Sequence, residues 1–174
     1  GTLMILYSYF RSSAAYRVRI ALNLKGLQAE YRFVHLVQGG GHQHSLEYRM
    51  LNPQGRVPFL IDTTDAGEIR LSQSWAILEY LEETHPETAL LPQDAAGRAR
   101  VRSIGQIMVA DMQPLQNLTV TQYLERQLAV DEAKRSAWLA GEQIVHPGFD
   151  TDCADAVADG VALARHRREV GHDQ

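Results

Sequence analysis

The first part of the chain runs from a strand-type pattern through a short turn into a helix-type pattern, and this run constrains the fold most. Residues 3–9 are rich in Leu, Ile, Met and Tyr, which is typical of a buried strand. From Ala14 onward apolar residues recur at helical spacing, and Gly26 follows where a helix C-cap belongs. Residues 31–37 alternate as a second strand does. A strand, a helix and a strand in this order favour a parallel strand pair with the helix across one face.

The turn between this strand and this helix reads Arg11-Ser12-Ser13 and places two hydroxyl groups at the start of a helix. A helix start offers unpaired backbone N–H groups and a partial positive charge. Hydroxyl groups there either cap the helix or help to hold an anion such as a thiolate. The turn alone leaves both roles open.

Residues 57–71 predict two further strands joined by a hairpin-type connection. Pro58 cannot donate a ladder hydrogen bond, so it belongs at the start of the first of these strands, where a cis bond is a reasonable expectation. Gln73 and Ser74 then open a second amphipathic helix that ends before Pro86. Both helix starts can face one cleft, which would offer hydroxyl groups and positive helix ends to a small peptide-like anion with an ionised thiol.

The rest of the chain predicts a linker over residues 87–95 and a helical domain over residues 96–174. The linker contains L-L-P-Q-D, and apolar residues follow a 3.6-residue period from Val101 to Leu118. Pro114 should kink or interrupt that helix. With residues 1–86 as the first domain, the predicted fold class is α/β followed by all-α.

Composition excludes several classes of protein. Hydrophobic residues make up 45 % and charged residues 22 %, as in a soluble globular protein, and a net charge of -4 gives no overall attraction to nucleic acid or an anionic membrane. The single cysteine, Cys153, excludes an internal disulfide framework and favours a reducing compartment. No run approaches the roughly 20 apolar residues of a membrane span, and no signal peptide is visible. We therefore expect a cytoplasmic protein. His42 and His44 lack a Cys or carboxylate at ligand spacing, so no metal site is expected.

Several motifs together resemble the zeta class of glutathione transferases over residues 3–149. They are Y-S-Y-F-R-S-S with R-V-R-I-A-L, L-N-P-Q-G-R-V-P, Q-S-x-A-I-L-E-Y-L-E-E-T, L-L-P-Q-D and D-M-Q-P-L-Q-N-L-T-V. The resemblance implies a thioredoxin-like N-terminal domain, a C-terminal helical domain, a homodimer, and glutathione bound in the cleft between domains.

The same resemblance implies a role for each matching residue. Ser12 would hydrogen-bond the glutathione sulfur, and Ser12 and Ser13 are the implied catalytic pair. Gln43 and the backbone of Val57 would hold the glycyl and cysteinyl parts, and Pro58 matches the cis-proline of the family. The implied glutathione-binding residues are Ser12, Ser13, Ala14, Gln43, Val57, Pro58, Gln73, Ser74, Gln113, Asn117, Leu118 and Thr119. From the residues alone, Gln43 also fits a solvated loop, and Gln73 and Ser74 also fit a helix cap.

The activity that the resemblance implies is the glutathione-dependent cis–trans isomerisation of maleylacetoacetate or maleylpyruvate in the catabolism of aromatic compounds. Its substrate carries carboxylates, for which Arg11 is the local candidate contact. Two alternatives stay open. One is general glutathione transfer or dehalogenation of α-haloacids, and the other is glutathione binding without useful turnover.

Two departures from the family pattern accompany these expectations. The family often has a cysteine at the position of Ala14, so a role for a protein thiol in the turn is not expected. After about residue 149 the sequence matches nothing expected of the family, which predicts an incomplete helical domain and a Cys153 without a catalytic role.

Overall fold

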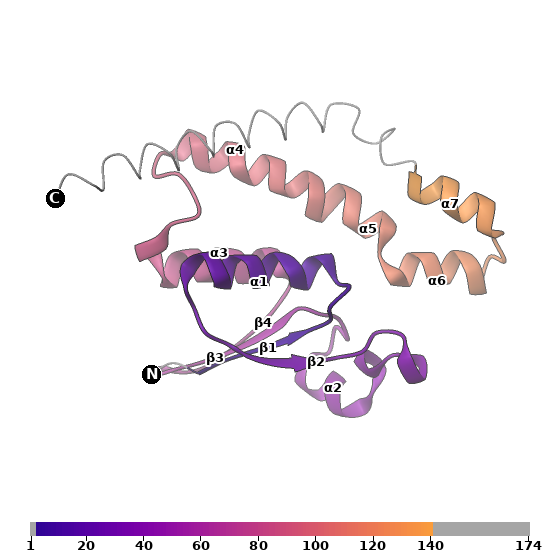
Figure 1. Cartoon of the computed structure of the whole chain (residues 1–174), viewed down its shortest axis with the longest axis horizontal. Coiled ribbons are helices and arrows are strands. Elements are labelled where there is room, and N and C mark those ends of the chain that lie inside the picture. Colours follow the sequence, from indigo (N-terminus) through magenta and orange to yellow (C-terminus); the bar gives the residue numbers. More distant parts are fainter. Residues whose placement is uncertain (1–2, 141–174) are drawn as a thin grey trace. The chain divides into compact units, whose positions relative to one another are not determined.

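The structure is a computed structural model that describes residues 3–140 (Figure 1). The predictions about Cys153 and the chain after residue 149 lie outside the described residues. The chain divides into two compact units between Pro92 and Gln93, and each unit is described by itself.

The N-terminal unit is a four-stranded sheet with helices on both faces. The strand order is β2-β1-β3-β4, with β1 parallel to β2 and antiparallel to β3, and with β4 antiparallel to β3. Helices α1 and α3 lie side by side over one face, and α2 lies on the other (Figure 1). This is the predicted thioredoxin-like arrangement. Its elements are β1 (Leu3–Ser8), α1 (Ser13–Lys25), β2 (Glu30–Phe33), η1 (Gln38–Gly40), η2 (His42–His44), α2 (Leu46–Leu51), β3 (Phe59–Thr64), β4 (Gly67–Ser72), α3 (Ser74–Thr84) and η3 (Pro86–Thr88).

Two hydrophobic clusters fill the spaces between the sheet and its helices. Because successive side chains of a strand point to opposite faces, Leu6 and Leu60 enter one cluster while Tyr7 and Ile61 enter the other. The cluster against α1 and α3 contains Met4, Leu6, Val18, Ala21, Leu22, Leu60, Ile77 and Leu81. The cluster on the α2 face contains Tyr7, Tyr9, Val34, Tyr48, Val57, Phe59 and Ile61.

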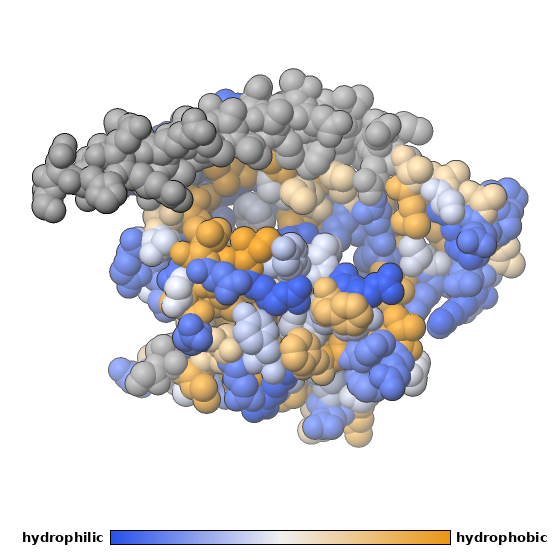
Figure 2. All heavy atoms as spheres, viewed as in Figure 1, coloured by the Kyte–Doolittle hydropathy of each residue, from blue (hydrophilic) through white to orange (hydrophobic). Residues whose placement is uncertain are grey.

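Helix α1 packs the apolar face that its sequence predicts against the sheet, although apolar residues also lie on its outer face. Val18 and Leu22 are fully buried against the sheet. The outer surface is mixed in character (Figure 2), because Ile20 and Leu24 are exposed beside the exposed polar Asn23. The helix ends as predicted at Gly26, whose φ of 70° is the left-handed C-cap conformation.

The segment between β2 and β3 contains Gly39, Gly40 and Gly41 and is built from short helices. It forms η1, η2 and α2, and the Ser45 hydroxyl caps α2 by accepting from Tyr48 N at 3.2 Å. The third strand starts at Phe59 rather than at residue 57, because Val57 and Pro58 belong to the turn before it.

A buried ion pair joins the ends of α1 and α3. Lys25 Nζ lies 2.7 Å from Glu82 Oε2, and both side chains are buried. The ammonium group also donates to two backbone carbonyls, and the carboxylate also accepts from two backbone N–H groups. These partners are the carbonyls of His85 and Thr88 and the N–H groups of Leu90 and Leu91.

Every regular element described in the second unit is helical, as the sequence predicts. The expected long helix is α-helical to Gln106 and π-helical from Ile107 to Met112, directly before the turn that contains Pro114, and it ends at the extended Asn117. The elements are α4 (Ala95–Gln106), η4 (Ile107–Met112), α5 (Gln113–Gln116), α6 (Leu118–Arg126) and α7 (Glu132–Ala140).

Candidate functional site

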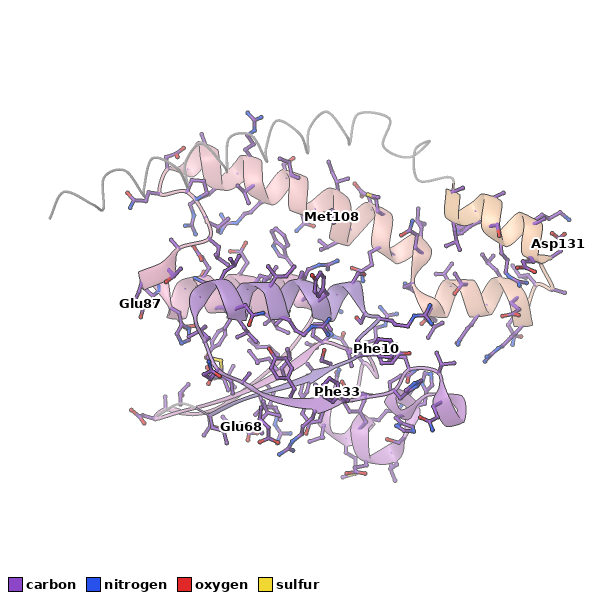
Figure 3. The ribbon with its side chains drawn as sticks, viewed as in Figure 1. Phe10, Phe33, Glu68, Glu87, Met108 and Asp131 are labelled. Atoms are coloured by element: carbon purple, nitrogen blue, oxygen red, sulfur yellow. The ribbon has the colours of Figure 1, made fainter. Side chains whose placement is uncertain are left out.

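The sheet register brings three of the predicted site segments to one end of the N-terminal unit. Tyr7 of β1 pairs with Phe59 of β3, and Phe59 pairs with Ser72 of β4. The end of β1, the start of β3 and the end of β4 are therefore neighbours across the sheet. The Ser12 turn, the Val57–Pro58 turn and the Gln73–Ser74 start of α3 follow or precede these strand ends directly. Figure 3 labels Phe10, an exposed residue of the Ser12 turn.

Ser12 caps helix α1, and the geometry of the cap leaves its hydroxyl hydrogen available. Its Oγ accepts from Ala15 N at 3.1 Å, and its own N–H donates to Tyr9 O at 3.0 Å. A hydroxyl oxygen can accept while its hydrogen donates elsewhere. The two roles that the sequence left open, capping and holding an anion, are therefore compatible. Ser13 is exposed, and Ala14 is half-buried in the first turn of the helix.

Gln73 and Ser74 start helix α3 with an unusual backbone conformation. Gln73 has φ 73° and ψ 115°, a backbone conformation that residues other than glycine rarely adopt. Its side chain does not cap the helix. Its Nε2 donates to Gln54 Oε1 at 2.6 Å. The Ser74 side chain is buried and its Oγ accepts from Arg17 Nη1 at 2.7 Å. An N-terminal helix end without a side-chain cap suits an anionic group.

The turn before β3 is held by hydrogen bonds to one carbonyl. Arg56 O accepts from Tyr48 Oη at 2.6 Å and from Asn52 Nδ2 at 2.8 Å. Burial raises the pKa of Tyr48 to about 12, so its phenol stays a donor near neutral pH. The Val57–Pro58 bond that follows is cis, and both residues are buried.

Gln43 is buried rather than solvated. Its Nε2 donates to Leu36 O at 3.1 Å, while its Oε1 has no hydrogen-bond partner among the described residues. Gly41 gives room for the amide, because a Cβ at that position would lie 2.5 Å from Gln43 Oε1. A buried amide oxygen without a donor fits a site that receives an N–H group from a ligand.

The remaining predicted site residues are Arg11 and four residues of the second unit, which is described by itself. Gln113, Asn117, Leu118 and Thr119 lie in the second unit, where Asn117 caps α6 by accepting from Val120 N at 3.0 Å. Arg11 is exposed and makes no hydrogen bond or ion pair with the described residues. A role for these residues in binding stays a prediction.

Arg17 is a residue near the site that the sequence did not single out. By its spacing in the sequence Arg17 lies off the apolar face of helix α1, where a solvated charge is the ordinary expectation. In the structure its guanidinium is half-buried, and that burial lowers its pKa, although arginine stays charged. Its contact with Ser74 spans 57 positions of sequence, so local spacing carries no signal for it.

Two absences hold for the part of the chain that the structure describes. No group of three or more His, Cys, Asp and Glu side chains is placed to hold a metal ion. None of the described helices is long and apolar enough to cross a membrane.

The strain at Gln73 gives a prediction. We expect Gln73→Gly to be more stable than Gln73→Ala by about 1 kcal/mol in urea denaturation, because only glycine adopts this conformation without steric cost. Both variants lose the contact with Gln54, so their difference reports the backbone alone. At ordinary helical or strand positions glycine is the less stable of the two. An alanine variant as stable as the glycine variant would show that the backbone is not strained.

Comparisons with known proteins find similarity to glutathione transferases and maleylacetoacetate isomerases. Residues 6–89 match the family model for the glutathione S-transferase N-terminal domain. The chain is 48% identical over 135 residues to a probable maleylacetoacetate isomerase of Vibrio cholerae, covering 78% of this chain and 61% of that protein. It is 44% identical over 164 residues to the maleylacetoacetate isomerase of Rattus norvegicus, covering 92% of this chain and 72% of that protein.

The chain is also similar to solved structures of isomerases of the same kind. A maleylacetoacetate isomerase of Anaeromyxobacter dehalogenans with bound GSH in the active site is 40% identical with a TM-score of 0.74, covering 89% of this chain and 70% of that one. A maleylpyruvate isomerase described as a bacterial glutathione S-transferase of the zeta class is 43% identical with a TM-score of 0.69, covering 77% and 60%. The chain thus covers between 60% and 72% of the length of these four relatives.

Proposed function

The chain belongs to the zeta class of glutathione transferases, and we propose that it binds glutathione at the three turns that lie together at one end of its sheet. The proposed reaction is the cis–trans isomerisation of maleylacetoacetate or maleylpyruvate to the fumaryl product. Relatives that carry these activities in their names, one of them solved with bound GSH, support the choice.

The residues present fit a tripeptide that carries a thiol. The buried Oε1 of Gln43 has no donor among the described residues, and a peptide N–H of the ligand can supply one. The N-terminus of α3 has no side-chain cap, and a carboxylate of the ligand can take the place of that cap. When bound, glutathione supplies a thiolate that adds to the cis double bond, allows rotation about the resulting single bond and leaves unchanged.

The observation that carries the proposal is the state of the Ser12 hydroxyl. Because Ala15 N donates to Oγ, the hydroxyl hydrogen is available to another acceptor at the positive end of α1. There the hydroxyl holds a sulfur atom in its ionised form, since a hydrogen bond to the charged form lowers the pKa of a thiol from its ordinary value of roughly 8.5. Ser13 lies beside it as the second proposed catalytic residue.

The rest of the tripeptide is assigned to the other turns. Val57 offers its backbone to the cysteinyl part, Gln43 binds toward the glycyl part, and Gln73 with Ser74 binds the γ-glutamyl end. The proposal keeps Ala14 and Pro58 as lining residues of these turns. From the second unit it includes Gln113, Asn117, Leu118 and Thr119.

Three further parts of the proposal rest on the family. Arg11 is proposed to contact a substrate carboxylate, since it is an exposed cation beside the serine turn. The active form is proposed to be a homodimer. A cytoplasmic location is proposed because an ionised thiol cofactor needs a reducing compartment.

The experiment is to supply the purified chain with a trace of glutathione and an excess of maleylacetoacetate or, separately, maleylpyruvate. We expect fumaryl product in many-fold excess over glutathione, with the glutathione concentration unchanged. Absence of fumaryl product from both substrates would contradict the proposal. Loss of glutathione in step with product from an α-haloacid would support transfer instead, and retention on a glutathione matrix without any turnover would support a binding protein.

A further inference from the structure

Arg17 links the two helices that start at the proposed glutathione site. It lies on α1, one turn beyond the Ser12 cap, and its Nη1 donates to the Oγ of Ser74, the first residue of α3, at 2.7 Å. The Ser74 side chain is buried, and the Arg17 side chain is half-buried. This is a side-chain contact between the two helix starts, made by a residue that the proposed function does not use.

The contact fixes what the Ser74 hydroxyl can do. A guanidinium group only donates hydrogen bonds, so Ser74 Oγ must be the acceptor in this pair. The hydroxyl hydrogen is then free to be donated to a different acceptor. At the N-terminus of α3 the acceptor favoured by the helix dipole is an anion.

We infer that Arg17 is a positioning residue, which turns the Ser74 hydroxyl into a donor for the α-carboxylate of the γ-glutamyl group. The inference rests on the proposed function, because it names how one end of the same tripeptide is recognised. Two effects of Arg17 act together: it orients the hydroxyl, and it adds a positive charge directly behind it.

Arg19 supplies a matched comparison within the same helix. It is also a half-buried arginine, two residues further along α1. Its Nη1 donates to Ser8 Oγ at 2.9 Å and to Tyr9 O at 3.3 Å, and so it supports the end of β1. Because Arg19 has no hydrogen bond to Ser74, replacing it should disturb the fold to a similar extent without changing recognition of the γ-glutamyl carboxylate.

The experiment measures the Kd of the full chain for glutathione and for an analogue whose γ-glutamyl α-carboxylate is a primary amide. The carboxylate preference is the Kd for the amide analogue divided by the Kd for glutathione. We expect Arg17→Met to lower this preference about 10-fold, through weaker binding of glutathione and nearly unchanged binding of the amide. Arg17→Lys should restore part of it, and Arg19→Met should keep the preference of the unmodified chain.

Ser74→Ala tests the carboxylate preference with a second substitution. We expect it to lower the preference, and we expect Arg17→Met added to Ser74→Ala to lower it little further, because both changes remove one coupled contact. If Arg17→Met does not fold, Arg17→Lys and Ser74→Ala still carry the comparison with Arg19→Met.

The outcomes separate this inference from the proposed function. An unmodified chain that binds no glutathione would overturn both. A chain that binds glutathione, but whose Arg17 variants keep the full carboxylate preference or lose no more of it than Arg19→Met, would overturn only the role of Arg17.

Discussion

Ser12→Ala is expected to lower the turnover of the proposed isomerisation by about 10- to 100-fold at pH 7 while glutathione still binds. A hydrogen bond to a charged group contributes roughly 1.5–3 kcal/mol, and here the charge is the thiolate. Without the hydroxyl the thiol pKa rises, so less of the bound glutathione is ionised at pH 7. The rate of the variant should therefore recover in part as the pH is raised. Steady-state kinetics over pH 6 to 9, with Kd measured separately, check both expectations.

The controls for this prediction separate the two roles of the same hydroxyl. Ser12→Asn keeps a good N-cap for Ala15 N but has no hydroxyl, so it should be nearly as stable as the unmodified chain and still slow. Ser12→Thr keeps both the cap and the hydroxyl and should retain most of the activity. Unchanged turnover in both the alanine and the asparagine variants would show that the Ser12 hydroxyl does not stabilise the thiolate.

Much of the N-terminal fold could be predicted because its signals are local. The strand-type run that ends at Tyr9, the capping turn at Ser12 and the left-handed cap at Gly26 each follow from a few adjacent residues. Helix α2 has little local signal in the sequence, because Tyr48 is the one buried residue among its six. Its start was still signalled by Ser45, a residue type that commonly caps helices.

The site could be predicted less completely, because several of its properties come from contacts between distant segments. The burial of Gln43 depends on packing within the segment that folds back between β2 and β3, and the role of Arg17 depends on α1 lying beside α3. The unusual φ of Gln73 has no sequence signal, since glutamine ordinarily avoids it. By contrast, the cap that Asn117 provides for α6 is a local feature that its residue type could have indicated.

The largest expected effect on stability comes from the buried pair of Lys25 and Glu82. Lys25→Met should lower the free energy of unfolding by about 3–5 kcal/mol, because it leaves a buried carboxylate without its counter-charge. The backbone carbonyls of His85 and Thr88 lose their donor in the same variant. Chemical denaturation at pH 7 measures the loss.

An exposed pair in the same unit is a matched control. Arg70 Nε and Glu68 Oε1 are 2.6 Å apart, almost the separation of the buried pair, but their side chains are 49% and 44% exposed. Arg70→Met should cost less than about 1 kcal/mol, because solvent already screens that pair. If the two variants lost equal stability, burial would not be what makes the Lys25 contact matter.

The pH dependence of stability tests the same pair from the carboxylate side. Burial alone would raise the pKa of Glu82, but the hydrogen bonds from Lys25 and from the N–H groups of Leu90 and Leu91 outweigh it and lower that pKa. A carboxylate with a lowered folded pKa stabilises the fold above its unfolded pKa of roughly 4.3, and this stabilisation is lost as the pH falls through the folded value. Glu82→Gln should therefore be less stable than the unmodified chain at pH 7, and the gap between them should narrow as the pH falls below about 4. A gap that stayed constant over that range would mean that the charge of Glu82 contributes nothing and that its hydrogen bonds alone hold the ends of α1 and α3 together.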